Sequence, residues 1–366
     1  SEGSTITLDD CSISVIETPG HTPEHISYIV THLSRGDEPA ALFSGDTLFV
    51  GDVGRPDLFP GRAHELASAL YDSLHEKIMK LPDYCEVYPA HGAGSFCGRS
   101  LSAKRTTTIG YERRFNQILQ IHDKEAFINE LTKNMPPSPD HFSRCSDENR
   151  RGPALLSTLP PVRGISPRAG KDLMTQGACE VLDTRRYDAF GSLHIPKSWN
   201  IDGEMNFSTF TGWVIPPDRD ILLAVHRPDE IPKITLMLHR VGIDRIIGYV
   251  EGGVWGWALA GHELDRVQTI SVQELDALLK ADKELIVLDV RTGAEFAGYH
   301  IPGSVNIHWP DLRTRYSELS REKRIAVLCA TGARSSMACS ILKRNGFSNI
   351  LNVAGGYTGW VAGGFQ

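Results

Sequence analysis

A cysteine at position 329 stands between two segments of different character, in the sequence Cys329-Ala330-Thr331-Gly332-Ala333-Arg334. Residues 325–328 are a run of apolar side chains that predicts a buried strand, and residues 335–344 carry apolar side chains at helical spacing. Backbone N–H groups in a strand-to-helix turn form an anion-binding nest, and the positive end of the helix dipole points at the sulfur. Both favour the thiolate, which is the nucleophilic form of cysteine.

The other residues of this loop have predicted roles of their own. Gly332 supplies the backbone freedom that the turn needs, and Arg334 places a cation at its far end. We therefore expect Cys329, Gly332 and Arg334 to be catalytic, and Ala330 and Thr331 to contact the substrate. A lone cysteine after an apolar run is more often a core residue, so the surrounding motifs decide between the two interpretations.

Those motifs occur on both sides of the loop. They are Leu288-Asp289-Val290-Arg291, Glu295-Phe296 and Gly298-Tyr299-His300-Ile301-Pro302-Gly303-Ser304 before it, and Asn352-Val353-Ala354-Gly355-Gly356 and Trp360 after it. In order and spacing, across residues 270–366, they resemble the rhodanese family of sulfurtransferases. The resemblance implies that the Cys329 thiolate takes a sulfur atom from a donor, becomes a persulfide, and passes the sulfur to sulfite, cyanide or a thiol. It also implies that Asp289 and Arg291 organise the loop.

Two other functions are open for this region. Rhodanese-like folds also host phosphatases and arsenate reductases, but their loop has one more residue than the C-x4-R spacing from Cys329 to Arg334. The shorter loop favours a sulfur atom over a tetrahedral oxyanion. The second alternative is a protein-interaction module, which the intact loop disfavours for residues 270–366.

Residues 166–264 repeat the pattern of residues 270–366. Four identical pairs are each 106 residues apart: Asp183 and Asp289, Arg185 and Arg291, His194 and His300, Pro196 and Pro302. Strand-like segments alternate with helical ones, which predicts a parallel α/β sheet in each copy. The position of Cys329 falls in residues 223–226, which hold no cysteine, and prolines follow. Since proline removes backbone donors, we expect the first copy to be structural and to support either the assembly or a domain interface.

In the N-terminal third, three predicted strands each deliver a His or Asp to a turn that contains glycine. The turns are Gly20-His21-Thr22, Gly45-Asp46-Thr47 and Ala90-His91-Gly92, and the strands preceding them belong to a set predicted at residues 12–16, 26–30, 41–44 and 85–88. An amphipathic helix is predicted over residues 63–80. Imidazole and carboxylate together suit iron, zinc or manganese.

These turns resemble three metal motifs of the metallo-β-lactamase superfamily, and the segments around them resemble its persulfide dioxygenase branch. The resemblance implies the C-terminal part of an αββα sandwich, a mononuclear non-haem Fe(II), and a metal set drawn from His21, Asp46 and His91. It also implies that Arg55 meets the carboxylates of a low-molecular-weight thiol substrate such as glutathione. The alternative is a thiolester hydrolase of the glyoxalase type with two zinc ions, fused to rhodanese modules that bind other proteins.

The superfamily's motif H-x-H-x-D-H is absent from the chain. We therefore expect residues 1–130 to be a partial metallo-β-lactamase domain and to bind metal weakly or not at all. A Pro-rich linker is predicted over residues 131–165.

Composition excludes several classes of function. The net charge of −7 and the lack of a basic stripe give no support to nucleic-acid binding, and no apolar run is long enough to cross a membrane. The seven cysteines are scattered and form no C-x-x-C pair, which predicts a reducing, cytoplasmic compartment. We also expect a homo-oligomer.

Taken together, the chain resembles a fusion of a persulfide dioxygenase with two rhodanese domains, all of α/β class. The resemblance implies sulfide detoxification: iron-dependent oxidation of a small persulfide to sulfite, and transfer of a further sulfur atom through Cys329 to give thiosulfate.

Overall fold

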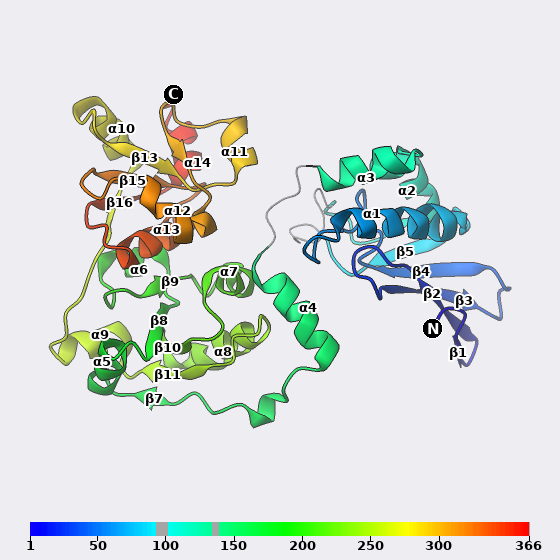
Figure 1. Ribbon diagram of the computed structural model, residues 1–366, viewed down its shortest axis with the longest axis horizontal. Coiled ribbons are helices and arrows are strands. Elements are labelled where there is room, and N and C mark those ends of the chain that lie inside the picture. Colours follow the sequence, from blue (N-terminus) through cyan, green and yellow to red (C-terminus); the bar gives the residue numbers. More distant parts are fainter. Residues whose placement is uncertain (93–101, 134–138, 366) are drawn as a thin grey trace. The chain divides into compact units, whose positions relative to one another are not determined.

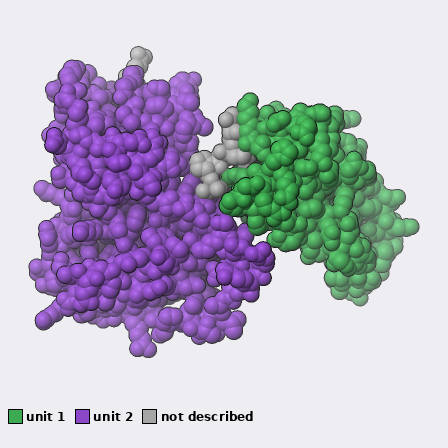
Figure 2. Space-filling view, in the orientation of Figure 1, with its two compact units in different colours: residues 1–138 green, residues 139–366 purple. Residues whose placement is uncertain are grey.

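The protein forms two compact units, Ser1–Ser138 and Pro139–Gln366 (Figure 2). The computed structural model describes residues 1–92, 102–133 and 139–365, so Cys97 lies outside the described residues. None of the helices in these ranges is long and apolar enough to span a membrane.

The first unit is built on a six-stranded sheet in the order β1-β2-β3-β4-β5-β6, in which only β4 and β5 pair in parallel. The strands are β1 (Thr5–Leu8), β2 (Cys11–Glu17), β3 (Ile26–His32), β4 (Pro39–Gly45), β5 (Glu86–Pro89) and β6 (Thr107–Thr108). The four predicted strands are confirmed as β2 to β5. Strand β1 was not predicted; its side chains are all exposed, so burial does not select them.

The predicted helix over residues 63–80 is confirmed as a continuous helical segment. It begins as α1 (Ala63–Asp72) and ends in a π-helical turn (Ser73–Lys77) and a 3-10 turn (Ile78–Lys80). The apolar stripe of this segment is buried against the sheet and consists of Leu66, Leu70, Leu74 and Ile78. With α2 (Ile109–Phe115) and α3 (Lys124–Thr132), it covers one face of the sheet (Figure 1).

The second unit contains two five-stranded parallel sheets with the same strand order, which confirms the predicted parallel α/β sheet in each copy. In the first copy the order is β7-β11-β10-β8-β9, and in the second it is β12-β16-β15-β13-β14. The strands of the first copy are β7 (Gly164–Ile165), β8 (Cys179–Asp183), β9 (Trp199–Asn200), β10 (Asp220–Ala224) and β11 (Ile246–Val250). Those of the second are β12 (Gln268–Ile270), β13 (Ile286–Asp289), β14 (Val305–Asn306), β15 (Ile325–Leu328) and β16 (Ile350–Val353).

Helices flank both sheets (Figure 1). In the first copy they are α5 (Pro167–Thr175), α6 (Tyr187–Ser192), α7 (Phe207–Val214), α8 (Ile231–His239) and α9 (Gly253–Leu259). In the second they are α10 (Val272–Ala281), α11 (Gly293–Gly298), α12 (Leu312–Arg315), α13 (Ala333–Arg344) and α14 (Gly356–Ala362).

The predicted linker over residues 131–165 is wrong for part of its length, because helix α4 (His141–Arg151) lies within it and belongs to the second unit. His141 is buried and packs against Gly212, where an added Cβ would lie 2.6 Å from the His141 ring. Arg144 Nη2 donates to the carbonyl of Val241 at 2.6 Å. The sequence conceals this helix because its one buried side chain is a histidine, and Phe142 and Cys145 are its only apolar residues.

Helix α13 follows the Cys329 loop and also packs against the first copy (Figure 1). Ser336 Oγ donates to Asn200 Oδ1 at 2.7 Å, and both residues are buried. Lys343 Nζ pairs with Asp265 Oδ1 at 2.8 Å, and the Arg344 guanidinium lies 4.2 Å from the centre of the Trp199 ring. The first copy therefore holds the helix on which the loop of the second copy depends.

Replacing Ser336 with Ala should lower the free energy of unfolding of the second unit by about 1–3 kcal/mol, because the buried Asn200 Oδ1 loses its donor. Urea unfolding followed by circular dichroism measures this change. Ser340→Ala is the matched control: Ser340 Oγ donates only to Met337 O within the same helix, so its loss should cost less. Equal effects of the two substitutions would contradict a stabilising contact between the copies.

Candidate functional site

Cys329 lies directly after β15, with no exposed surface. The backbone N–H of Gly332 donates to Cys329 Sγ at 3.1 Å, and Ser335 Oγ lies 3.5 Å from the same sulfur. A buried sulfur with a backbone donor aimed at it is suited to carrying negative charge. The strand, turn and helix predicted around Cys329 are therefore found, with an amide of the turn facing the sulfur.

Glycines allow the loop to take this shape. Gly332 has φ = 113°, a left-handed conformation that other residues rarely adopt. A Cβ on Gly356 would lie 2.3 Å from the carbonyl oxygen of Cys329. The next residue, Tyr357, donates its backbone N–H to that oxygen at 2.7 Å. Any side chain at position 356 would therefore push the cysteine out of place.

A buried polar pair fixes the loop from the side of β16. Asn352 Nδ2 donates to the carbonyl of Gly332 at 3.1 Å, and Asn352 Oδ1 accepts from Ser335 Oγ at 2.6 Å. The motif Asn352-Val353-Ala354-Gly355-Gly356 contained this asparagine, but Ser335 was not among the predicted site residues. Its position as the third residue after Gly332 and its burial are the features that connect it to the sulfur.

Arg334 is held by a carboxylate. Its Nη1 and Nη2 donate to Glu295 Oε2 and Oε1 at 2.8 and 2.7 Å. Burial raises the pKa of Glu295, but the hydrogen bonds and charge of Arg334 outweigh it and lower that pKa to about 2. Glu295 also caps α11, where it accepts from the backbone N–H of Thr292 at 3.0 Å. The spacing from Thr292 to Glu295 is that of a capping box, which is the sequence signal for this carboxylate.

The roles predicted for Ala330 and Thr331 stay predictions. Their carbonyl oxygens accept from Thr358 N and Gly355 N, both at 3.0 Å, which ties the loop to the start of α14. The Thr331 residue is exposed.

His308 was not predicted and lies close to the ion pair. It is buried, and its Nδ1 has no hydrogen-bond partner among the described residues. Burial lowers its pKa, and the charge of Arg334 acts in the same direction.

Asp289 and Arg291 form a buried pair, with Arg291 Nη2 2.7 Å from Asp289 Oδ2. Arg291 also donates to the carbonyl of Tyr299 at 2.7 Å. The first copy makes the same contact between Asp183 and Arg185, at 2.6 Å, although it lacks the cysteine. The pair is therefore part of the scaffold, as the resemblance implied.

In the first unit, His21, Asp46 and His91 meet at the ends of the strands. Asp46 Oδ1 lies 3.1 Å from His91 Nε2 and 3.9 Å from His21 Nε2. His21 Nδ1 is hydrogen-bonded to the carbonyl of Arg55 at 2.9 Å, which turns Nε2 towards Asp46. Such a second contact is typical of metal-binding histidines. Burial raises the pKa of Asp46, but the close contact with His91 and the charges of the nearby imidazoles outweigh it and lower that pKa.

His25 lies in the same place but supports the turn. Its Nε2 accepts from the backbone N–H of Asp46 at 3.0 Å, and its Nδ1 lies 2.9 Å from both Thr18 Oγ1 and Thr47 Oγ1. A Cβ on Gly45 would lie 2.5 Å from its ring. Both ring nitrogens are thus used in positioning the Asp46 turn.

Arg55 is buried and forms an ion pair with Asp57. Its Nε and Nη2 donate to the two carboxylate oxygens of Asp57, both at 2.7 Å. Binding of a substrate carboxylate by Arg55 stays a prediction, and it requires the substrate to share or displace Asp57.

The three side chains provide the donor types for a metal but do not complete a site. Across residues 1–92, 102–133 and 139–365, no cluster of three or more His, Cys, Asp or Glu side chains is arranged to hold a metal ion. His91 Nε2 lies 3.1 Å from Asp46 Oδ1, so a metal would have to replace this contact. These residues do not distinguish iron from zinc.

The Glu295–Arg334 pair should make the free energy of unfolding depend on pH in the acidic range. Because the pKa of Glu295 is lowered from its ordinary 4.5 to about 2, the pair stabilises the folded state above about pH 4.5, and this stabilisation is lost as the pH falls towards 2. Glu295→Gln should therefore flatten the fall of unfolding free energy across that range, as measured by urea titrations at several pH values. Glu274→Gln, at the same capping-box position of α10 but exposed, is the matched control. An unchanged slope in Glu295→Gln would contradict the prediction.

The rhodanese-like domain family matches residues 271–363 of the chain. A sulfurtransferase of Allochromatium vinosum is 31% identical over 98 residues, which are 27% of this chain and 92% of that protein. The mitochondrial persulfide dioxygenase ETHE1 of Mus musculus is 30% identical over 150 residues, which are 41% of this chain and 52% of that protein. The chain spans about half the length of several curated relatives that it matches.

The fold is also found in a solved structure. A metallo-β-lactamase from Staphylococcus aureus is 34% identical with a TM-score of 0.60, and the match covers 68% of this chain and 70% of that one. With a rhodanese domain around Cys329 and these relatives, the chain belongs to the family of metallo-β-lactamase–rhodanese fusion proteins.

Proposed function

We propose that this chain is a sulfurtransferase of sulfur metabolism that carries sulfur as a persulfide on Cys329. The observation that carries the proposal is the backbone N–H of Gly332, which donates to Cys329 Sγ at the junction of β15 and α13. This donor and the start of α13 can stabilise negative charge on the inner sulfur before and after transfer.

The transfer proceeds in two displacements. The Cys329 thiolate attacks the outer sulfur of a small persulfide, the S–S bond of the donor breaks, and the donor thiolate leaves with the electron pair. Sulfite then attacks the outer sulfur of the Cys329 persulfide, which gives thiosulfate and returns the Cys329 thiolate. No electrons enter or leave overall, so the loop needs no redox cofactor for this step.

The position of Arg334 supports sulfur transfer over phosphate or arsenate chemistry. An oxyanion site needs an arginine fork free to bind the anion. Here both terminal nitrogens of Arg334 donate to Glu295, and the loop is one residue shorter than in the phosphatase branch. A single sulfur atom needs only the space and donors around Cys329.

For the first unit we propose a part in the iron-dependent oxidation of a low-molecular-weight persulfide to sulfite in the intact protein. The similarity to ETHE1 and the convergence of His21, Asp46 and His91 support this reaction class. The sulfite would then serve as the acceptor at Cys329.

Cys329→Ser should lower the rate of sulfur transfer by at least about a thousandfold, because an alcohol cannot form the persulfide. Thiosulfate formation from sulfite and glutathione persulfide measures the rate, and intact-protein mass spectrometry measures the loss of the added sulfur atom. Cys339→Ala is the matched control: Cys339 is fully buried in α13, and burial raises the pKa of its thiol. Activity retained by Cys329→Ser would sink the proposal.

Metal content tests the first unit. We expect well below one equivalent of tightly held metal per chain, because an ion would have to replace the contact between His91 and Asp46. Mass spectrometry of the dialysed protein measures it, with His21→Ala as the variant that removes a donor. One equivalent of iron would contradict this expectation and strengthen the oxidation proposal; one equivalent of zinc would contradict it and favour a hydrolase.

A further inference from the structure

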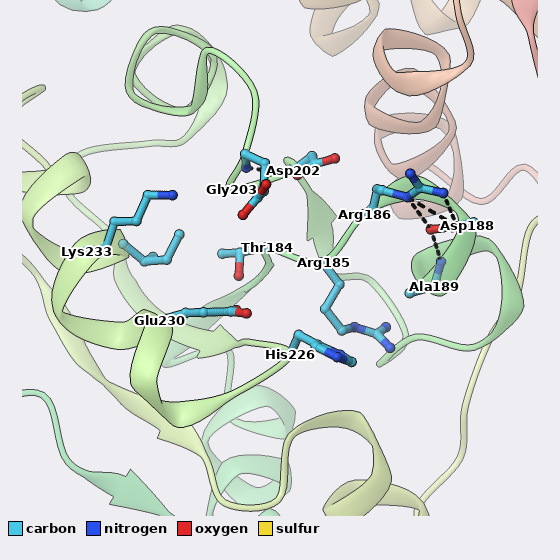
Figure 3. Close-up of a pocket in the computed structure, with 12 residues that line it drawn as sticks. Thr184, Arg185, Arg186, Asp188, Ala189, Asp202, Gly203, His226, Glu230 and Lys233 are labelled. Carbon is cyan, nitrogen blue, oxygen red and sulfur yellow. Dashed lines mark hydrogen bonds and ion pairs between the residues drawn. The ribbon is translucent and has the colours of Figure 1, made fainter.

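The first copy of the rhodanese fold contains a cavity of about 360 Å³ at the carboxyl ends of its strands (Figure 3). It lies beside β8 and β10, between which the strand order reverses. In open parallel sheets this is the place where ligands bind. The volume is within the range of small-molecule sites.

Strand register shows what replaced the cysteine. Ala224 pairs with Asp183 as Leu328 pairs with Asp289, so Val225 occupies the position of Cys329. Val225 is buried and has no nucleophilic atom. The cavity therefore cannot repeat the chemistry of the second copy.

At three positions of the cavity, the side chain differs in size or polarity from the one at the equivalent position of the second copy. Backbone hydrogen bonds at equivalent places align Thr184 with Val290, Asp202 with His308 and Gly203 with Trp309. The second copy has an apolar residue, an imidazole and a buried indole, where the first has a hydroxyl, a carboxylate and no side chain. The space next to Gly203 is filled by Ile234, since the ideal Cβ of Gly203 would lie 2.7 Å from Ile234 Cδ1, at the cavity wall.

Two of the polar groups are buried without full compensation. Thr184 is 5% exposed, and its Oγ1 has no hydrogen-bond partner among the described residues. Asp202 is 9% exposed and accepts the backbone N–H of Glu204 at 2.9 Å, with no cation paired to it in the described part of the chain. A buried carboxylate without a cation is costly, so this end of the cavity favours a positively charged group.

The positively charged side chains around the cavity differ in whether they are already part of an ion pair. Arg185 forms an ion pair with Asp183, and Arg186 forms one with Asp188, both at 2.6 Å. Lys233 has no ion pair among the described residues, and Figure 3 shows it on the same side as Asp202, with Thr184 between Asp202 and Glu230. Among the described residues, the charged groups of the cavity without an ion pair are thus the buried carboxylate of Asp202 and two exposed groups, the Lys233 ammonium and the Glu204 carboxylate.

We propose that this cavity binds an amino-acid zwitterion. The ligand's ammonium group would be held by Asp202 and the Thr184 hydroxyl, and its carboxylate by Lys233. Its short side chain would pack on Ile234. The copy without a cysteine would then be a ligand-binding domain joined to the sulfur-transferring copy through α13. This inference does not depend on the reaction at Cys329.

Isothermal titration of the full chain with S-methyl-L-cysteine tests the proposal, because the blocked thiol cannot react at Cys329. We expect saturable binding of at least millimolar strength, about −4 kcal/mol. N-acetyl-S-methyl-L-cysteine, which lacks the ammonium group, should not bind. Saturable binding of both compounds alike, or of neither at up to about 10 mM, would overturn the proposal.

Substitutions locate the site. Thr184→Val, which installs the residue type of the second copy, and Asp202→Asn should each weaken binding at least tenfold. Thr235→Val is the matched control, because Thr235 Oγ1 also lacks a partner among the described residues but lies outside the cavity. Thermal unfolding without ligand should show Thr184→Val at least as stable as the wild type, since it removes an unpaired buried hydroxyl. Wild-type affinity in both cavity variants would show that the zwitterion binds elsewhere.

Discussion

The burial of α13 is the constraint on which the second unit depends. Its residues from Ser335 to Leu342 are all buried, so the helix has almost no side turned to solvent. One face packs on the sheet of its own copy, and another meets the first copy through Ser336 and Asn200. Because the Cys329 loop ends where this helix begins, the first copy helps to position a nucleophile that it does not itself possess.

The two copies show which features of the fold are scaffold and which are chemistry. The buried pair of Asp289 and Arg291 recurs as Asp183 and Arg185, and the stacked pair of Phe296 and His300 recurs as Phe190 and His194. These contacts persist whether or not a cysteine is present. The replacements that change the chemistry, Val225 for Cys329 and Thr184 for Val290, lie at the carboxyl ends of the strands, where a change alters the ligand site and leaves the sheet intact.

Much of this architecture could be predicted from the sequence. The repeat of identical residues identified the duplication, and apolar periodicity located the strands and the helix over residues 63–80, because burial selects those side chains. Three features escaped prediction for physical reasons. Helix α4 buries a histidine, Glu295 acts on Arg334 across 39 positions of sequence, and the polar lining of the first copy's cavity emerges only when Thr184 is aligned in space with Val290 and Asp202 with His308. Each depends on contacts between segments that no local pattern records.

The contact between Glu295 and Arg334 gives a physical reason why the first copy lacks both residues together. At the equivalent positions of the first copy, counted along the chain from the aligned strands, Ala189 replaces Glu295 and Glu230 replaces Arg334. Loss of Glu295 alone would leave a largely buried guanidinium without its partner, and loss of Arg334 alone would leave a carboxylate facing the loop. The pair therefore links two distant positions of the chain, so that a domain of this kind tolerates both residues or neither.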